Sequence, residues 1–307
     1  MNEISVSLVK ELREKTGAGM MNCKKALVKS AGDLEGAIDW LRSSGLAAAA
    51  KKANRIAAEG LVAVKVSESS GVVIEINAET DFVARNDEFK EFVNEVACLA
   101  LTSGANSADL LTSLMDNGET VSDTINTLIA KIGENIKIRR VEFLKIKKGI
   151  ICSYIHNSIA PGLGKIGVLV AIESEGEKAA LEMFGRQIAM HIAATSPRWG
   201  SIKEVPENEL EREKMILMEQ AKISGKPEKI IEKMVEGRIG KFFSEFVLLE
   251  QISVIDNETK IFKAVEKAEF ECGAPLKISG FQRFSLGEGL EKNSNDFASD
   301  VAATINN

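Results

Sequence analysis

The chain has few of the residues that commonly serve in catalysis or metal binding. It contains two histidines, His156 and His191, one tyrosine and two tryptophans in 307 residues. A site with three histidine ligands is therefore excluded, and few general bases of this type remain. No run of about 18 apolar residues occurs, so no transmembrane helix is expected. These absences favour a protein that acts by binding over an enzyme.

Cysteines are also scarce and scattered. Cys23, Cys98, Cys152 and Cys272 form no Cys-x-x-Cys pair, so neither a structural zinc site nor a redox dithiol is expected, and a reducing compartment fits. Residues 1–10 contain no arginine, no long apolar core and no small-residue cleavage site. They predict neither a secretory signal nor a transit peptide, and we therefore expect a cytoplasmic protein.

The remaining composition is that of an ordinary globular protein, 45% hydrophobic and 27% charged, and its length predicts about two domains. The net charge of −6 argues against a protein whose main role is to coat nucleic acid. Residues 1–56 differ from the whole, because they carry ten lysines and arginines against six acidic residues.

The same N-terminal residues predict a small helical module. Ser5 or Ser7 can cap a first helix, and Asp33 can cap a third. Closely spaced glycines, which favour turns, separate the helices. The predicted helices run up to Thr16, from Met20 to Ser30, from Asp33 to Gly45, and over the alanine-rich residues 46–58.

An α+β core is predicted after this module. Two β-branched runs at residues 61–66 and 72–76 precede a helix at 87–101. The same order recurs with strands at 150–155 and 166–172 and a helix at 178–194. We therefore expect two related α+β halves, residues 57–140 and 141–285, each with a sheet backed by helices.

Two helical additions complete the predicted fold. Charged residues with periodic apolar positions, broken before Pro227, predict an antiparallel hairpin at about residues 207–243 that projects from the body. Phe297, Val301 and Ile305 align on one face of a short C-terminal helix.

Three candidate sites have ordinary structural interpretations. Gly162–Gly167 matches G-x-G-x-x-G but precedes a strand, which favours a hairpin loop over a dinucleotide site. The basic stretch Lys137–Lys148 can contact phosphates, although a solvated strand face is favoured. His191 lies on an apolar helix and is expected to bond locally, whereas His156 borders a loop and is more open to a contact role.

Two further segments point to a partner surface. Phe82 lies between a strand and a helix, where it is either a hydrophobic staple on that helix or an exposed wedge for a partner pocket. Met20 and Met21 cannot both face the core of one short helix, so at least one is expected to be exposed.

Five motifs occur in the order Thr16–Leu27, Thr80–Val83, Ala130–Ile136, Met190–Ala194 and Ser224–Pro227. Together they resemble one family, bacterial elongation factor Ts. The resemblance spans nearly the whole chain. Its departures are Asn22, where an acidic residue is common, and a longer loop after His156.

The resemblance implies a nucleotide exchange factor that binds elongation factor Tu with GDP or without nucleotide and promotes GDP release. It implies no covalent chemistry, cofactor or metal of its own, and requires neither a membrane nor nucleic acid. It implies a module similar to ubiquitin-associated domains at residues 1–56, core subdomains at 57–140 and 141–285, a coiled-coil hairpin at about 207–243 and a C-terminal module at 286–307.

The resemblance also implies the contact residues. Asp81 and Phe82, within Thr80–Val83, approach the magnesium-binding side of the partner, where Phe82 inserts between helices. His156 meets another domain of the partner. Contacts to the partner's nucleotide domain are implied for Met20, Met21, Lys24, Ile132 and Gly133.

Two rival functions remain at this stage. The basic residues of 1–56 and Lys137–Lys148 also fit an RNA-binding, ribosome-associated protein. An enzyme that uses the Gly162–Gly167 loop is the weaker rival.

Overall fold

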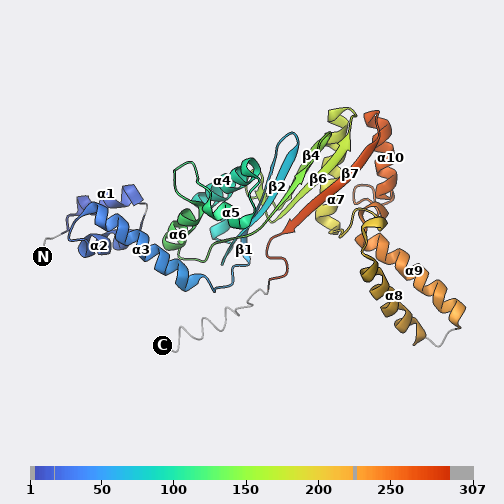
Figure 1. Ribbon diagram of the computed structural model, residues 1–307, viewed down its shortest axis with the longest axis horizontal. Coiled ribbons are helices and arrows are strands. Elements are labelled where there is room, and N and C mark those ends of the chain that lie inside the picture. The colour runs from blue at the N-terminus through green and yellow to red at the C-terminus, as the bar shows by residue number, and fades with distance from the viewer. Residues whose placement is uncertain (1–3, 17, 224–226, 291–307) are drawn as a thin grey trace.

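The computed structural model describes residues 4–16, 18–223 and 227–290 (Figure 1). A three-helix module at the N-terminus is joined to a central α+β core, and a helical hairpin projects from the other side of the core. The predicted α+β class is confirmed. The predicted C-terminal helix, with Phe297, Val301 and Ile305, lies outside the described residues.

The N-terminal module consists of α1 (Val6–Thr16), α2 (Met20–Lys29) and α3 (Leu34–Lys52). The predicted caps are present: the Ser5 hydroxyl accepts from the Leu8 amide, and the Asp33 carboxylate accepts from the Gly36 amide at 2.8 Å. A small apolar core holds the three helices together. Its buried members are Val9, Leu12, Cys23, Ala26, Leu27 and Ala37.

The predicted end of the third helix at Gly45 is wrong, because α3 continues without a break to Lys52. Gly45 lies where α3 crosses α6 (Val121–Ile132), and a β-carbon built there would come within 3.5 Å of the Ala130 β-carbon. Gly45 therefore lies inside the helix at this crossing, where a β-carbon would make an ordinary van der Waals contact. The predicted helix over 46–58 is the end of α3, and the chain beyond Lys52 is not helical.

The core has four layers, helix–sheet–sheet–helix, which Figure 1 shows from left to right. One sheet has the strand order β3-β2-β1-β5 and the other has the order β4-β6-β7, with every neighbouring pair antiparallel. The strands are β1 (Glu59–Val66), β2 (Ser70–Ala78), β3 (Lys137–Lys145), β4 (Ile150–His156), β5 (Leu163–Gly164), β6 (Ile166–Ser174) and β7 (Leu276–Ser285).

Side-chain alternation along the strands builds three apolar layers. In β2, Val72 and Ile74 face α4 (Asp87–Ser103) and α6, whereas Val73 faces the second sheet. The outer face of the second sheet packs on α7 (Lys178–Thr195) and α10 (Ile261–Cys272). The shorter helical elements are α5 (Ser107–Thr112), η1 (Val83–Arg85), η2 (Ile202–Glu204) and η3 (Leu248–Glu250).

The two halves repeat one plan in detail. The pairing of β2 with β3 shifts register between Glu75 and Ile76, and the pairing of β6 with β7 shifts between Ala171 and Ile172. Opposite each shift lies a glycine with positive φ, Gly60 at +120° and Gly149 at +128°. A β-carbon at either glycine would collide with a carbonyl oxygen of the neighbouring strand, so the repeated bulge requires glycine twice.

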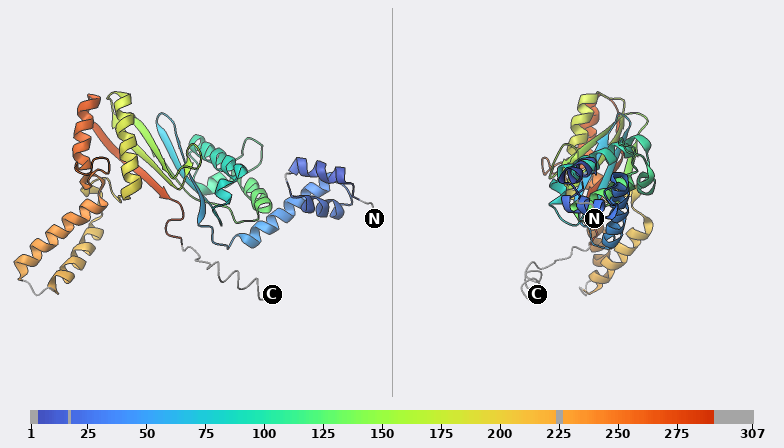
Figure 2. Two further views of the ribbon diagram at one scale, coloured as in Figure 1. Left: turned by 180° about the vertical axis from the view of Figure 1, so that it is seen from behind. Right: turned by 90° about the vertical axis from the view of Figure 1, so that its left-hand side faces the viewer.

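The predicted hairpin is α8 (Glu207–Lys222) and α9 (Glu228–Phe246), which extend away from the core in both views (Figures 1 and 2). Pro227 directly precedes α9, as expected of a residue that starts a helix. An apolar seam joins the helices. Its buried members are Leu217, Ala221, Ile231, Val235 and Ile239.

Candidate functional site

The connection between β2 and α4 holds its aromatic residue in solvent. Phe82 is 77% exposed, whereas the next residue, Val83, is 4% exposed and belongs to the apolar core. The Asn86 side chain caps α4 by accepting from the Phe89 amide at 3.1 Å. Phe82 therefore does not staple the following helix, and Val83 anchors the turn instead.

A pair of carboxylates ties this turn to the segment that follows α6. Glu134 accepts from the Thr80 amide at 2.9 Å and from the Thr80 hydroxyl at 2.6 Å. In the opposite direction, Glu79 accepts from the Asn135 amide at 2.6 Å. We call these four residues, Glu79, Thr80, Glu134 and Asn135, the reciprocal brace. It brings the Phe82 turn beside Ile132 and Gly133, and the resemblance implies partner contacts for both segments.

The reciprocal brace also holds the linker from the N-terminal module. The buried side-chain amide of Asn135 donates from Nδ2 to the carbonyl oxygens of Ala53 and Arg55, at 3.3 and 2.8 Å. Arg55 pairs with Glu79 at 3.5 Å. Sequence reasoning did not select Glu79, Glu134 or Asn135 as site residues, because their partners are at least 24 positions away along the chain and no local periodicity reveals them.

The predicted contact residues of the module form a separate surface. Met20 and Met21 are 40% and 66% exposed, and Lys24 is also exposed, because Cys23 and Ala26 take the inner face of α2. Both methionines therefore face solvent, whereas the helical spacing required only that at least one of them be exposed. The length of α3 separates this surface from the Phe82 turn (Figure 1).

His156 ends β4 and is exposed, with its ring Nδ1 3.3 Å from the Tyr154 hydroxyl. The longer loop that follows forms β5, which pairs with β1 and adds a fourth strand to the first sheet. In this region the glycines permit close packing: a β-carbon at Gly167 would lie 2.7 Å from Val62. The hairpin-loop interpretation of Gly162–Gly167 is confirmed.

His191 is fully buried and bonded locally, as predicted. Its Nδ1 accepts from the Val254 amide at 3.2 Å, so the ring is neutral and its Nε2 donates to the Gln251 side chain at 2.8 Å. Burial lowers the pKa of His191 below its usual value, and the bond to Gln251 offsets this in part. The network attaches the segment after the hairpin to α7.

The favoured solvated-face interpretation of the basic stretch is wrong for its two arginines. Arg139 and Arg140 both bind the fully buried Glu75, at 3.0 and 2.6 Å. Burial alone would raise the pKa of Glu75, but hydrogen bonds from the Gly287 amide, Asn77 and Arg140 hold that pKa below its usual value. These arginines therefore join the first sheet to the end of β7. Because both are paired with Glu75, the proposal that this basic stretch binds phosphates is weakened.

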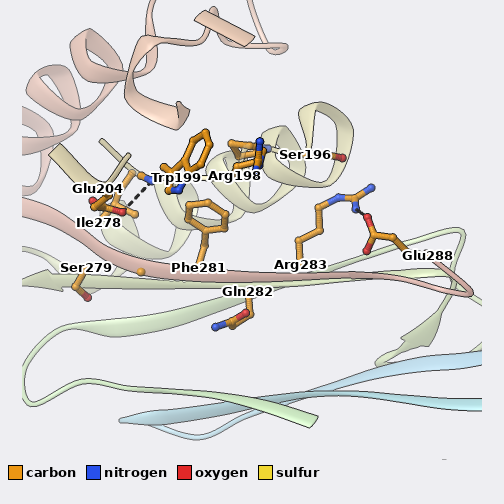
Figure 3. A pocket seen from close by; sticks show the side chains of 13 residues that line it. Ser196, Arg198, Trp199, Glu204, Ile278, Ser279, Phe281, Gln282, Arg283 and Glu288 are labelled. Carbon is orange, nitrogen blue, oxygen red and sulfur yellow. Dashed lines mark hydrogen bonds and ion pairs between the residues drawn. The ribbon is translucent and has the colours of Figure 1, made fainter. Parts of the chain in front are cut away.

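A cavity of about 460 Å³ lies beside β7, but none of the predicted site residues lines it (Figure 3). Arg198 stacks over the Trp199 ring at 4.3 Å, and Arg283 pairs with Glu288 at 3.3 Å, so both cations are already engaged. In the ranges that the structure describes, no three potential metal ligands gather into one group. Every described helix is too short or too polar to cross a lipid bilayer.

The exposed Phe82 thus lies on a turn held by hydrogen bonds, at an α+β core that carries a helical module and a helical hairpin. A sequence profile of the family described as Elongation factor TS matches residues 79–288. The chain is 56% identical to elongation factor Ts of Rhodospirillum rubrum over 99% of both chains, and 54% identical to that of Gluconobacter oxydans over 99% of this chain and 98% of the other. It belongs to the elongation factor Ts family, and its role is that of a translation elongation factor in protein biosynthesis.

Proposed function

We propose that this protein is a guanine nucleotide exchange factor that binds elongation factor Tu and promotes the release of GDP. The observation that carries the proposal is Phe82, a large apolar side chain held in solvent on a turn that is braced from behind. Apolar exposure of this kind is typical of side chains that fill a partner pocket. The factor itself makes and breaks no covalent bond and uses no cofactor.

Within Thr80–Val83, the proposed contacts divide by exposure. Phe82 enters the partner near its magnesium site, and Asp81, about half exposed and paired with Arg85 at 3.7 Å, lies beside it. Thr80 and Val83 hold the turn, through Glu134 and the apolar core respectively. The proposal therefore assigns direct contact to two of the four residues and support to the others.

The thermodynamic basis is reciprocal coupling. A factor that binds the nucleotide-free partner more tightly than the GDP-bound partner must weaken GDP by the same ratio. GDP and its Mg²⁺ are held by a phosphate loop and switch residues, so a wedge that displaces those groups supplies the difference. One aromatic residue in a pocket contributes about 2–4 kcal/mol, which is about 30- to 1,000-fold in affinity.

Three further surfaces complete the proposed complex. Met20, Met21 and Lys24 contact the nucleotide domain together with the Ile132–Gly133 turn, and His156 meets another domain of the partner. The exposure of Met20, Met21, Lys24 and His156 supports these roles, whereas Ile132 and Gly133 are partly buried. We keep the division into residues 1–56, 57–140, 141–285 and 286–307, and cytoplasmic residence, as parts of the proposal.

The direct test is the release of labelled GDP from purified elongation factor Tu in the presence of excess unlabelled GDP. We expect release to accelerate with the concentration of this protein and to saturate. Unchanged release at saturating protein contradicts the proposal. Steeply salt-dependent binding of RNA by the protein alone would instead support the RNA-binding alternative.

A further inference from the structure

The turn that carries Phe82 is anchored in the apolar core at Val83, but it has little support of its own on the N-terminal side of Phe82. β2 ends at Ala78 and α4 begins at Asp87, and the only regular element between them is the short η1, which has no side-chain cap. A large side chain on such a connection samples many orientations unless other groups restrict the backbone, and this freedom must be lost on binding. On the N-terminal side of Phe82, the restriction therefore has to come from outside the turn.

The reciprocal brace restricts the backbone of this turn. One Glu134 carboxylate accepts both the amide and the hydroxyl of Thr80, two positions before Phe82. Hydrogen bonds to a charged acceptor are the stronger kind, and two of them on one residue fix its backbone direction. In the other direction, the Glu79 carboxylate accepts a hydrogen bond from the backbone amide of Asn135, so each segment holds the other.

The second half of the core indicates that this arrangement is not a requirement of the fold. α6 and α10 both end at a glycine with positive φ, Gly133 and Gly273. The next residue is Glu134 in the first half and Ala274 in the second. The scaffold therefore forms without a carboxylate at this position, and Glu134 is present where the neighbouring turn carries Phe82.

We infer that Glu134 is a positioning residue for nucleotide exchange, which acts by holding the Phe82 turn in the orientation that enters the partner. This inference rests on the proposed exchange function. Glu134 contributes through Phe82 and not through a contact of its own with the partner.

The test compares GDP release from purified elongation factor Tu with the full-length protein and its variants. Glu134→Ala is expected to lower stimulated release about 10-fold, and Glu134→Gln, which keeps an acceptor for the Thr80 amide, is expected to recover most of it. Glu204→Ala is the matched control, since Glu204 also accepts from one amide, Gly200, and one hydroxyl, Ser201. It should leave release unchanged.

A double-mutant cycle with Phe82→Ala separates positioning from general support. If Glu134 acts through Phe82, the double variant is no slower than Phe82→Ala alone. Additive losses, or wild-type release by Glu134→Ala, overturn the inference. When Phe82→Ala alone is silent, the wedge of the proposed function fails as well, whereas a slow Phe82→Ala beside a normal Glu134→Ala removes only the role of Glu134.

Discussion

The two β–α connections of the core occupy equivalent places in the repeated halves and have opposite characters. After β2, the chain runs from Ala78 to Asp87 and exposes Phe82. After β6, it passes directly from Ser174 to Lys178, and Gly176 packs on Cys272 so closely that a β-carbon would lie 2.6 Å from the sulfur. The same scaffold thus carries a short turn that is tightly packed at Gly176 and a longer turn that exposes Phe82 to solvent.

The helices behind these turns are nearly identical in pattern, which strengthens the comparison. The buried positions of α4 recur in α7 with the same spacing. The structural difference is therefore confined to the connection and its brace and does not extend to the packing of the helices. The matching sets are Phe89, Phe92, Val93, Val96, Ala97 and Ala100 in α4, and Leu181, Phe184, Gly185, Ile188, Ala189 and Ile192 in α7.

Substitution of Phe82 is the strongest test of the difference between the two turns. We expect Phe82→Ala to reduce stimulated GDP release by about 30- to 1,000-fold, because the aromatic side chain fills the partner pocket. The melting temperature should barely change, since the side chain is solvated. Phe270→Ala is the matched control: Phe270, on α10, is 89% exposed in the other half. Equal losses for both variants would contradict the assignment of function to the first turn.

Glu75 tests the junction between the halves. The corresponding position beside the bulge of the second half is the apolar Ala171. Glu75→Ala should lower the free energy of unfolding by about 3 kcal/mol, because Arg139 and Arg140 lose their buried partner. Urea denaturation measures this loss. A stability within error of wild type would mean that the arginines find other acceptors.

Gly176 tests whether the closed turn is only structural. Gly176→Ala should cost about 2 kcal/mol in unfolding free energy, since the new methyl group collides with Cys272. Stimulated GDP release at a temperature where the variant is folded should equal that of wild type. A release defect without a stability defect would show that the second turn also contributes to exchange.

The smallest effect concerns His191, whose place in α7 corresponds to the apolar Leu99 of α4. Because burial lowers its pKa, the unfolded chain binds a proton that the folded chain does not as the pH falls below about 6.5. Stability should therefore decrease between pH 7 and 5, by at most about 1.4 kcal/mol per pH unit.

The control for this prediction is His191→Gln, which cannot titrate. Its urea midpoint should vary less over the same range of pH. The window avoids Glu75, whose lowered pKa removes stability only as the pH falls below its ordinary value of about 4.5. Parallel profiles for both proteins would exclude His191 as the source of the slope.

The periodic parts of the chain were predictable because local spacing determines them. The strands β1, β2, β4 and β6, the helices α4 and α7, and the hairpin follow from β-branched runs and helical repeats. Helical geometry required only that at least one of Met20 and Met21 be exposed. Long-range features were not predictable. Gly45 has the local properties of a helix end, yet α3 continues through it at the point where it crosses α6.

The candidate site divides in the same way. Phe82 was identifiable as either a staple or a wedge, and its exposure excludes the staple. Glu134 and Glu75 were not identifiable, because each binds groups far away in the chain. The arginines that bind Glu75 gave the misleading signal of a basic surface, since a sequence does not reveal which charges a fold will pair.

The unbroken α3 has a consequence for the direction in which the N-terminal module faces. Its 19 residues form a rod of about 28 Å that packs in the module at Ala37 and on α6 at Gly45. Each residue of an α-helix rotates the chain about the helix axis by about 100°. Inserting one residue between these two positions would leave both parts folded but turn the Met20–Met21 surface by that angle. The number of residues between Ala37 and Gly45 therefore determines the direction in which the Met20–Met21 surface faces relative to the Phe82 turn.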